Sequence, residues 1–252
     1  MSEPPLRADW TDDRLVTQPI RRLIIILLAA SLVAGGAFWW RERQPAAAAR
    51  PVYVALGASD TVGVGADQPA LNAWVPLVAA GLPDQPALVN LGINGATVAE
   101  VLQQELPVAL DAKPAWVTLW PGVNDIRHDV ALSDFTRDLN TVLDRLRPSH
   151  ARVVLLTIPD LRLLPAFAGI DPVTLDQTVR QWNAVIRDAA QRHNAILVDL
   201  YADAPELARH PEYLSGDGFH PSSAGYRRIA DLALKEIHAH ADAHAQAVSP
   251  LA

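Results

Sequence analysis

Five short apolar runs, separated by helical patterns, limit the fold of this sequence more than any other feature. The runs are rich in Val, Ile and Leu and span Val52–Leu56, Ala87–Leu91, Ala115–Leu119, Arg152–Ile158 and Ala195–Leu200. Their apolar residues are mostly continuous, which is typical of strands covered on both faces. Helical patterns lie near residues 71–81, 96–106, 133–147, 172–193 and 221–241, with Asp171-Pro172 and Pro221 as expected helix starts. The alternation predicts an α/β domain, with five parallel strands and helices on both faces of the sheet.

A separate apolar stretch at residues 23–40 predicts a transmembrane helix. It holds 18 uncharged residues, or about 27 Å of helix, between Arg22 and Arg41, and it ends in Trp39-Trp40. A signal peptide cleaved near Ala48 is the alternative, but the stretch is long for one and charges intervene before the alanines. The arginines favour a cytoplasmic N-terminus, which predicts a membrane-anchored protein with an extracytoplasmic domain.

The expected organisation follows from these two patterns. Residues 1–22 form a disordered tail, 23–40 the anchor, 41–51 a linker, 52–241 the catalytic domain and 242–252 a flexible tail. A net charge of −7 gives no basic footprint for nucleic acid, and the absence of cysteine excludes disulfides and a thiol nucleophile. His238, His240 and His244 have no acidic or thiolate partner to complete a metal site, so we expect a solvated helix end. The sequence does not indicate an oligomeric state.

Polar segments that contain glycine follow the first three predicted strands, and a fourth precedes the last helix. Because ligands bind beyond the carboxyl ends of parallel strands, we expect these segments to meet at one edge of the sheet. Ser59 follows the first strand, and Asp217 and His220 lie three residues apart in the last segment. A carboxylate that orients an imidazole makes it a usable base, which predicts Ser59 as nucleophile, His220 as base and Asp217 as the orienting group. Taken alone, Asp217 and His220 could equally cap a surface helix.

An acyl-transfer reaction also needs donors for a developing oxyanion. The candidates are the backbone N–H groups of Ser59 and Gly92 and the side-chain amide of Asn124. Each candidate alone is weak evidence for an oxyanion site, since Gly92 could form a tight bend and Asn124 a turn. Their order along the chain is more specific.

These segments together resemble the SGNH hydrolases, also called the GDSL esterase/lipase family. The resemblance spans about residues 52–237 and lies in Asn90-Leu-Gly-Ile-Asn-Gly-Ala-Thr97, Gly122-Val-Asn-Asp125 and Asp217-Gly-Phe-His-Pro221. It implies a flavodoxin-like three-layer α/β/α fold, a Ser-His-Asp triad at Ser59, His220 and Asp217, and no metal or other cofactor. One block departs from the family pattern, because Ala58 stands where the family has Asp and Asp60 follows the serine.

The function implied is a serine esterase or lipase that cleaves small-molecule or lipid esters. Two alternatives stay open: an acyltransferase of the same architecture, and a non-catalytic binding module. The segment at 159–170 is apolar for a loop, and Leu161, Leu163, Leu164 and Phe167 in it are candidates for substrate binding or for core packing. Trp74 and Trp120 have the same two interpretations, with core packing the more usual.

Overall fold

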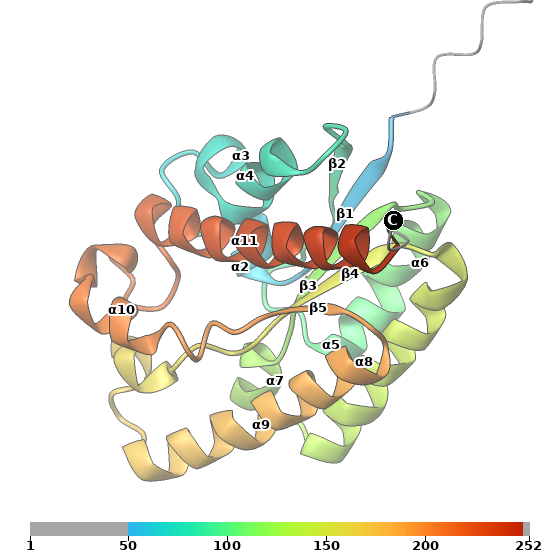
Figure 1. Ribbon diagram of the computed structural model, residues 1–252. Helices are drawn as coiled ribbons and strands as arrows, with labels where there is room; N and C mark the ends of the chain where they lie inside the picture. Colours follow the sequence, from blue (N-terminus) through green and yellow to red (C-terminus); the bar gives the residue numbers. More distant parts are fainter. Residues whose placement is uncertain (1–49, 249–252) are drawn as a thin grey trace, which may run out of the picture. The chain divides into compact units, whose positions relative to one another are not determined.

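The five predicted strands form one parallel sheet, in the order β2-β1-β3-β4-β5 (Figure 1). The computed structural model describes residues 50–248. The strands are β1 (Val52–Gly57), β2 (Ala87–Asn90), β3 (Trp116–Trp120), β4 (Arg152–Leu156) and β5 (Ile196–Val198). This order matches the flavodoxin-like arrangement, in which the chain changes direction across the sheet between β1 and β3. The predicted α/β fold with a five-stranded parallel sheet is therefore confirmed.

The apolar runs are mostly continuous because β1, β3, β4 and β5 each pack against two cores, whereas the edge strand β2 is largely exposed. Along β1, Val54 and Leu56 belong to one buried cluster, and Tyr53 and Ala55 belong to the other. Figure 1 shows the two helical layers that cover these clusters. The first layer holds α5 (Val98–Glu100), α6 (Leu106–Asp111), α8 (Leu132–Leu146) and α9 (Pro172–Arg192), and the second holds α3 (Pro69–Asn72), α4 (Trp74–Gly81) and α11 (Ser223–Val248).

The remaining described elements are short and lie mainly in the connections. They are α2 (Ser59–Val62), the π-helix η1 (Val101–Glu105), α7 (Val123–Arg127), η2 (Arg147–Ser149), η3 (Leu161–Leu163), η4 (Pro165–Phe167), α10 (Ala204–Arg209) and η5 (Pro211–Tyr213). Two predicted helices are interrupted. The one at 71–81 breaks at Ala73, and the one at 96–106 passes through η1 and continues to Asp111.

The two predicted helix starts have different outcomes. Asp171 caps α9 as expected, because its side chain accepts the backbone N–H of Thr174 at 2.8 Å. The start at Pro221 is wrong. Pro221 forms an isolated bridge with Leu214, and the helix begins after Ser222, whose hydroxyl accepts the N–H of Gly225 at 3.2 Å.

The last helix, α11, extends further toward the C-terminus than predicted. Helix α11 runs through Val248, so residues 242–248, which the sequence assigned to a flexible tail, are helical. Five alanines between residues 239 and 247 favour this continuation.

The predicted tail at 1–22 and anchor at 23–40 lie outside the described residues, as does most of the linker. Between residues 50 and 248, no helix is both long enough and apolar enough to span a membrane.

Candidate active site

Ser59 lies where β1 passes into α2, at the carboxyl edge of the sheet. It is the first residue of α2 and is 8% exposed. The turn that leads to it requires glycine at position 57, which has a φ of +139° and where an added Cβ would lie 2.5 Å from Oγ1 of Thr61. Strand β1 therefore leads to the serine at the carboxyl edge of the sheet through a turn that only glycine can form without strain.

His220 lies on a loop whose two ends are joined by hydrogen bonds. The N–H of Ser215 donates to the carbonyl of His220 at 2.8 Å, and Leu214 forms the bridge to Pro221. Gly218 turns the loop with a φ of +68°, and its N–H donates to the carbonyl of Ser215 at 3.0 Å. The loop thus holds the imidazole through its own backbone contacts.

Ser59, His220 and Asp217 form a continuous chain of hydrogen bonds. The distance from Nε2 of His220 to Oγ of Ser59 is 2.9 Å, and that from Nδ1 of His220 to Oδ2 of Asp217 is 2.6 Å. Asp217 also accepts the hydroxyl of Ser215 and the N–H groups of Phe219 and His220, all on Oδ1. The structure therefore brings the three predicted residues together.

The charge of Asp217 fixes where the imidazole proton lies. Burial acts to raise the pKa of Asp217, but hydrogen bonds from His220, the backbone and Ser215 outweigh it and hold this pKa well below its usual range. An ionised carboxylate can only accept hydrogen bonds. Nδ1 of His220 therefore carries the ring proton and donates a hydrogen bond to Asp217. In the neutral imidazole Nε2 then has a free lone pair facing the Ser59 hydroxyl.

The three predicted oxyanion donors differ in the hydrogen bonds that they already make. Within the described residues, the backbone N–H of Ser59 has no hydrogen-bond acceptor. The N–H of Gly92 donates to Oδ1 of Asn90 at 3.1 Å, and Nδ2 of Asn124 donates to the carbonyl of Ala96 at 3.1 Å. An amide nitrogen has two protons, so Asn124 keeps a second one for a ligand.

Gly92 packs directly against the nucleophile turn. A Cβ at this position would lie 2.9 Å from Cβ of Thr61 and 3.1 Å from the carbonyl oxygen of Ala58. Asn90 connects the same two segments, because its Nδ2 donates to the carbonyl of Thr61 at 2.7 Å while its Oδ1 accepts from Gly92. Asn90 lies in one of the motifs, but its role could not be predicted from the sequence.

Two buried carboxyl groups near the site were also missed. Asp125, 1% exposed, accepts the N–H of Val98 at 3.1 Å, and burial raises its pKa to about 6. Glu105, also 1% exposed, accepts the N–H of Gly57 at 2.8 Å, and burial raises its pKa to about 8. A sequence signal existed for Glu105, because it occupies the buried face that Val98, Val101 and Ala109 share at helical spacing.

Asp60, which with Ala58 departs from the family block, is half-buried. It lines a cavity of about 70 Å³ together with Trp120 and with Phe219 and Pro221, which flank His220. Burial raises its pKa to about 6, while the attraction of His220 acts to lower it. The backbone carbonyl of Asp60 accepts Nε1 of Trp74 at 2.9 Å, and Trp74 is fully buried.

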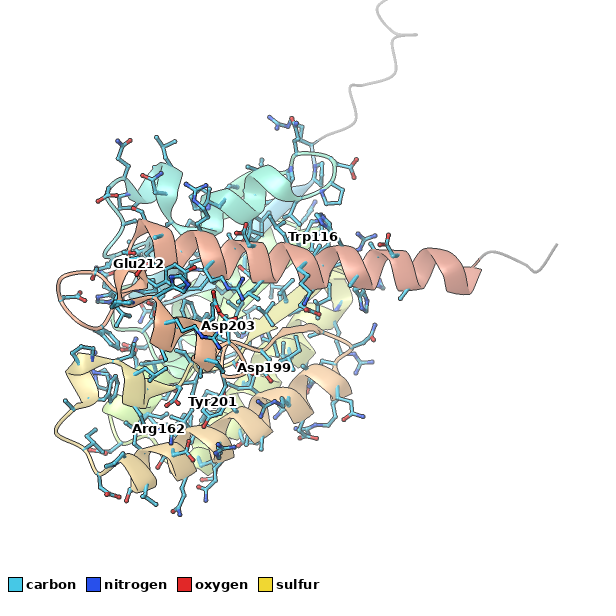
Figure 2. The ribbon with its side chains drawn as sticks, turned by 60° about the vertical axis from the view of Figure 1, so that its left-hand side comes forward. Trp116, Arg162, Asp199, Tyr201, Asp203 and Glu212 are labelled. Atoms are coloured by element: carbon cyan, nitrogen blue, oxygen red, sulfur yellow. The ribbon has the colours of Figure 1, made fainter. Side chains whose placement is uncertain are left out.

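The apolar loop at 159–170 packs mostly into the core. Leu161, Leu164 and Phe167 are at most 5% exposed and belong to one buried cluster, and Leu163 is half-buried. Leu161 and Leu164 line the cavity beside Asp60, whereas Phe167 lines a groove of about 510 Å³ next to His220. Arg162 fixes the loop by pairing with Asp160 and with Asp176 on α9, which also accepts the hydroxyl of Tyr201 (Figure 2).

The groove beside His220 combines apolar and charged walls. Phe167, Ile170 and Phe219 line it, and the guanidinium of Arg127 lies 5.0 Å from the centroid of the Phe219 ring. In the described part of the chain, no group of three or more His, Asp or Glu side chains could hold a metal ion.

Comparison with known proteins places this geometry among related folds. A model of the GDSL-like Lipase/Acylhydrolase family matches residues 55–228. An acetylxylan esterase of Geobacillus stearothermophilus is 29% identical over 157 residues, which cover 60% of this chain and 71% of that protein. The esterase TesA of Pseudomonas aeruginosa is 28% identical over 187 residues, which cover 73% and 86% respectively. The crystal structure of the Geobacillus stearothermophilus acetylxylan esterase matches with a TM-score of 0.62 at 25% identity, covering 74% of this chain and 94% of that one.

Proposed function

The chain belongs to the GDSL-like Lipase/Acylhydrolase family and is a hydrolase of ester bonds, and from this premise we propose that it cleaves carboxylic esters through an acyl-enzyme on Ser59. One observation carries the proposal. Two consecutive hydrogen bonds, of 2.9 and 2.6 Å, connect the Ser59 hydroxyl to the Asp217 carboxylate through His220. A nucleophile, a base and a group that orients the base are the three parts that covalent acyl transfer needs.

During acylation a proton passes from Ser59 to His220 and then to the leaving group. Oγ of Ser59 attacks the ester carbonyl while Nε2 of His220 takes the hydroxyl proton. The resulting imidazolium is stabilised by Asp217, which remains ionised because its pKa is held low. Nε2 then gives the proton to the departing alcohol, leaving an ester between Ser59 and the acyl group. A water molecule attacks that ester by the same route, and the acid is released.

The negative oxygen formed in each step would lie against the three donors around Ser59. The free N–H of Ser59 and the second amide proton of Asn124 can bind this oxygen without breaking an existing hydrogen bond. The N–H of Gly92 is different, because it must leave or share its bond to Asn90. Losing one such donor typically costs about 3–4 kcal/mol of transition-state stabilisation.

The groove beside His220 would receive one half of the ester. Its wall of Phe167, Ile170 and Phe219 suits an apolar acyl chain or an apolar alcohol. The names of the relatives, an acetylxylan esterase and an esterase, support a carboxylic ester as the substrate class.

Hydrolysis of an ester panel by the full-length protein, from acetyl to long acyl chains, tests the proposal. We expect Ser59→Ala to abolish turnover while the circular dichroism spectrum stays unchanged. Ser133→Ala is the matched control, because Ser133 is exposed on α8 and donates no hydrogen bond within the described residues. Turnover by Ser59→Ala at the wild-type rate, or no turnover of any ester by the folded wild type, would overturn the proposal.

A further inference from the structure

We propose that Glu105 is a positioning residue for the nucleophile, whose buried side chain holds the end of β1 in the conformation that presents Ser59 to His220. The inference rests on the proposed function of Ser59. Glu105 contacts no predicted substrate position, so it would act only through the backbone that it binds.

The position of Glu105 connects two segments of the site. Its Oε2 accepts the N–H of Gly57, two residues before Ser59, at 2.8 Å. The carbonyl of Gly57 in turn accepts the N–H of Ile93 at 3.0 Å, and Ile93 follows Gly92. Glu105 and Ile93 therefore bind the two sides of the same residue, Gly57, at which the nucleophile strand and the Gly92 segment meet.

Apart from the N–H of Gly57, the surroundings of Glu105 give no structural reason for a carboxyl group. Its helical face is otherwise apolar, with Val98, Val101 and Ala109 all buried. Its second oxygen, Oε1, is buried without a hydrogen-bond partner among the described residues. Leaving such a group unpaired costs about 1–3 kcal/mol, so the side chain stabilises the Gly57 turn at a cost to the rest of the protein. The Glu105 side chain thus lowers stability and at the same time binds the nucleophile turn. We expect this combination for a residue that serves activity.

The local backbone supports the same interpretation. Glu105 is the last residue of the π-helix η1, and single-turn π-helices occur frequently at functional sites. In addition, Ala58 gives the nucleophile turn no polar side chain of its own at the position before Ser59. Glu105 supplies an acceptor to this turn from the neighbouring helix.

The protonation state of Glu105 is compatible with this role. Burial raises its pKa to about 8, and the nearby Glu100 adds to the increase. At neutral pH the group is uncharged, so it adds no negative charge close to the developing oxyanion. Above pH 8 it ionises, and a negative charge there opposes the oxyanion.

The test compares two substitutions of Glu105 in the full-length protein. Glu105→Leu removes the acceptor, and we expect kcat to fall about 100-fold with KM within about twofold, because small displacements of reacting groups cost rates of this order. Glu105→Gln keeps an amide oxygen for the Gly57 N–H, so we expect it to retain kcat within about threefold at pH 7. Gln104→Leu, on the exposed side of the same π-helix, is the matched control and should behave as the wild type.

The pH profile gives a second readout, which decides the question even where Glu105→Leu does not fold. We expect kcat of the wild type to decline above about pH 8 and that of Glu105→Gln to decline less. A folded Glu105→Leu protein with wild-type kcat would overturn the inference, as would identical alkaline limbs for the wild type and Glu105→Gln. Both outcomes presuppose Ser59-dependent turnover by the wild type, and the absence of that turnover refutes the proposed function instead.

Discussion

Replacing Glu105 by Gln should change how the stability of the protein depends on pH. The pKa of Glu105 is about 8 in the folded protein, against 4.5 for the exposed side chain. Between these values the unfolded chain loses the proton and the folded chain keeps it. The free energy of unfolding therefore falls as pH rises from 4.5 to 8, and it is constant with respect to this group outside that window.

The size of the effect follows from the difference between the two pKa values, which is about 3.5. Each pKa unit corresponds to about 1.36 kcal/mol, so the group removes about 5 kcal/mol of stability between pH 4.5 and pH 8. Whole domains are stable by only about 5–15 kcal/mol, so the effect is large. The Glu105→Gln variant has no ionisable proton at this position. Its free energy of unfolding should therefore not depend on pH through this site.

Urea unfolding at several pH values between 5 and 9, followed by tryptophan fluorescence, measures this difference. Asp60 and Asp125 also have raised pKa values, but they are present in both proteins and cancel in the comparison. The unpaired amide group of Gln adds an offset that does not vary with pH. We expect the free energy of unfolding of the variant to increase by several kcal/mol relative to that of the wild type as pH rises. A difference that stays constant from pH 5 to pH 9 would refute the reasoning.

Three further predictions concern the site and the ends of the chain. Asp217→Asn should lower kcat about 10³-fold with little change in the melting temperature, because an amide can favour the wrong imidazole tautomer; a loss below tenfold would contradict the role of the carboxylate. Gly92→Ala should lower kcat by about tenfold or more, because its Cβ would lie 2.9 Å from Thr61 and displace the nucleophile turn, and steady-state kinetics with unchanged kcat would exclude this contact as important. Deleting residues 1–49 should move the protein from the membrane pellet to the supernatant on fractionation, if residues 23–40 anchor it, and an equal distribution of both forms would refute the anchor.

The sheet was predictable because four of its five strands pack against helices on both faces, whereas β2 is largely exposed. Short continuous runs of Val, Ile and Leu favour such strands, and the five runs correspond to β1–β5 within two residues at each end. The short helices α2 and α7 were not predicted, since four or five residues are too few to show a helical period. The bridge of Pro221 to Leu214 was also hidden, because it depends on a residue seven positions away.

The candidate site was partly predictable for a related reason. Segments after parallel strands must meet at one edge of the sheet, which is why Ser59, Gly92, Asn124 and His220 could be grouped from their order alone. The hydrogen bond between Asn90 and Gly92 could not be foreseen, because it depends on the side-chain conformation of Asn90. Glu105 interrupts an apolar stripe and could have been noticed, but only the structure identifies Gly57 as its partner.

The separation of Ser59 and His220 along the chain also has a consequence for biosynthesis. The two residues are 161 positions apart, yet their side chains form a hydrogen bond. A ribosome that adds about 5–20 residues per second needs about 8–32 s to pass from one to the other. Throughout that time the nascent polypeptide contains the serine without its base. We therefore expect the growing protein to be catalytically silent until His220 has been translated, and products truncated before His220 should be inert toward cellular esters.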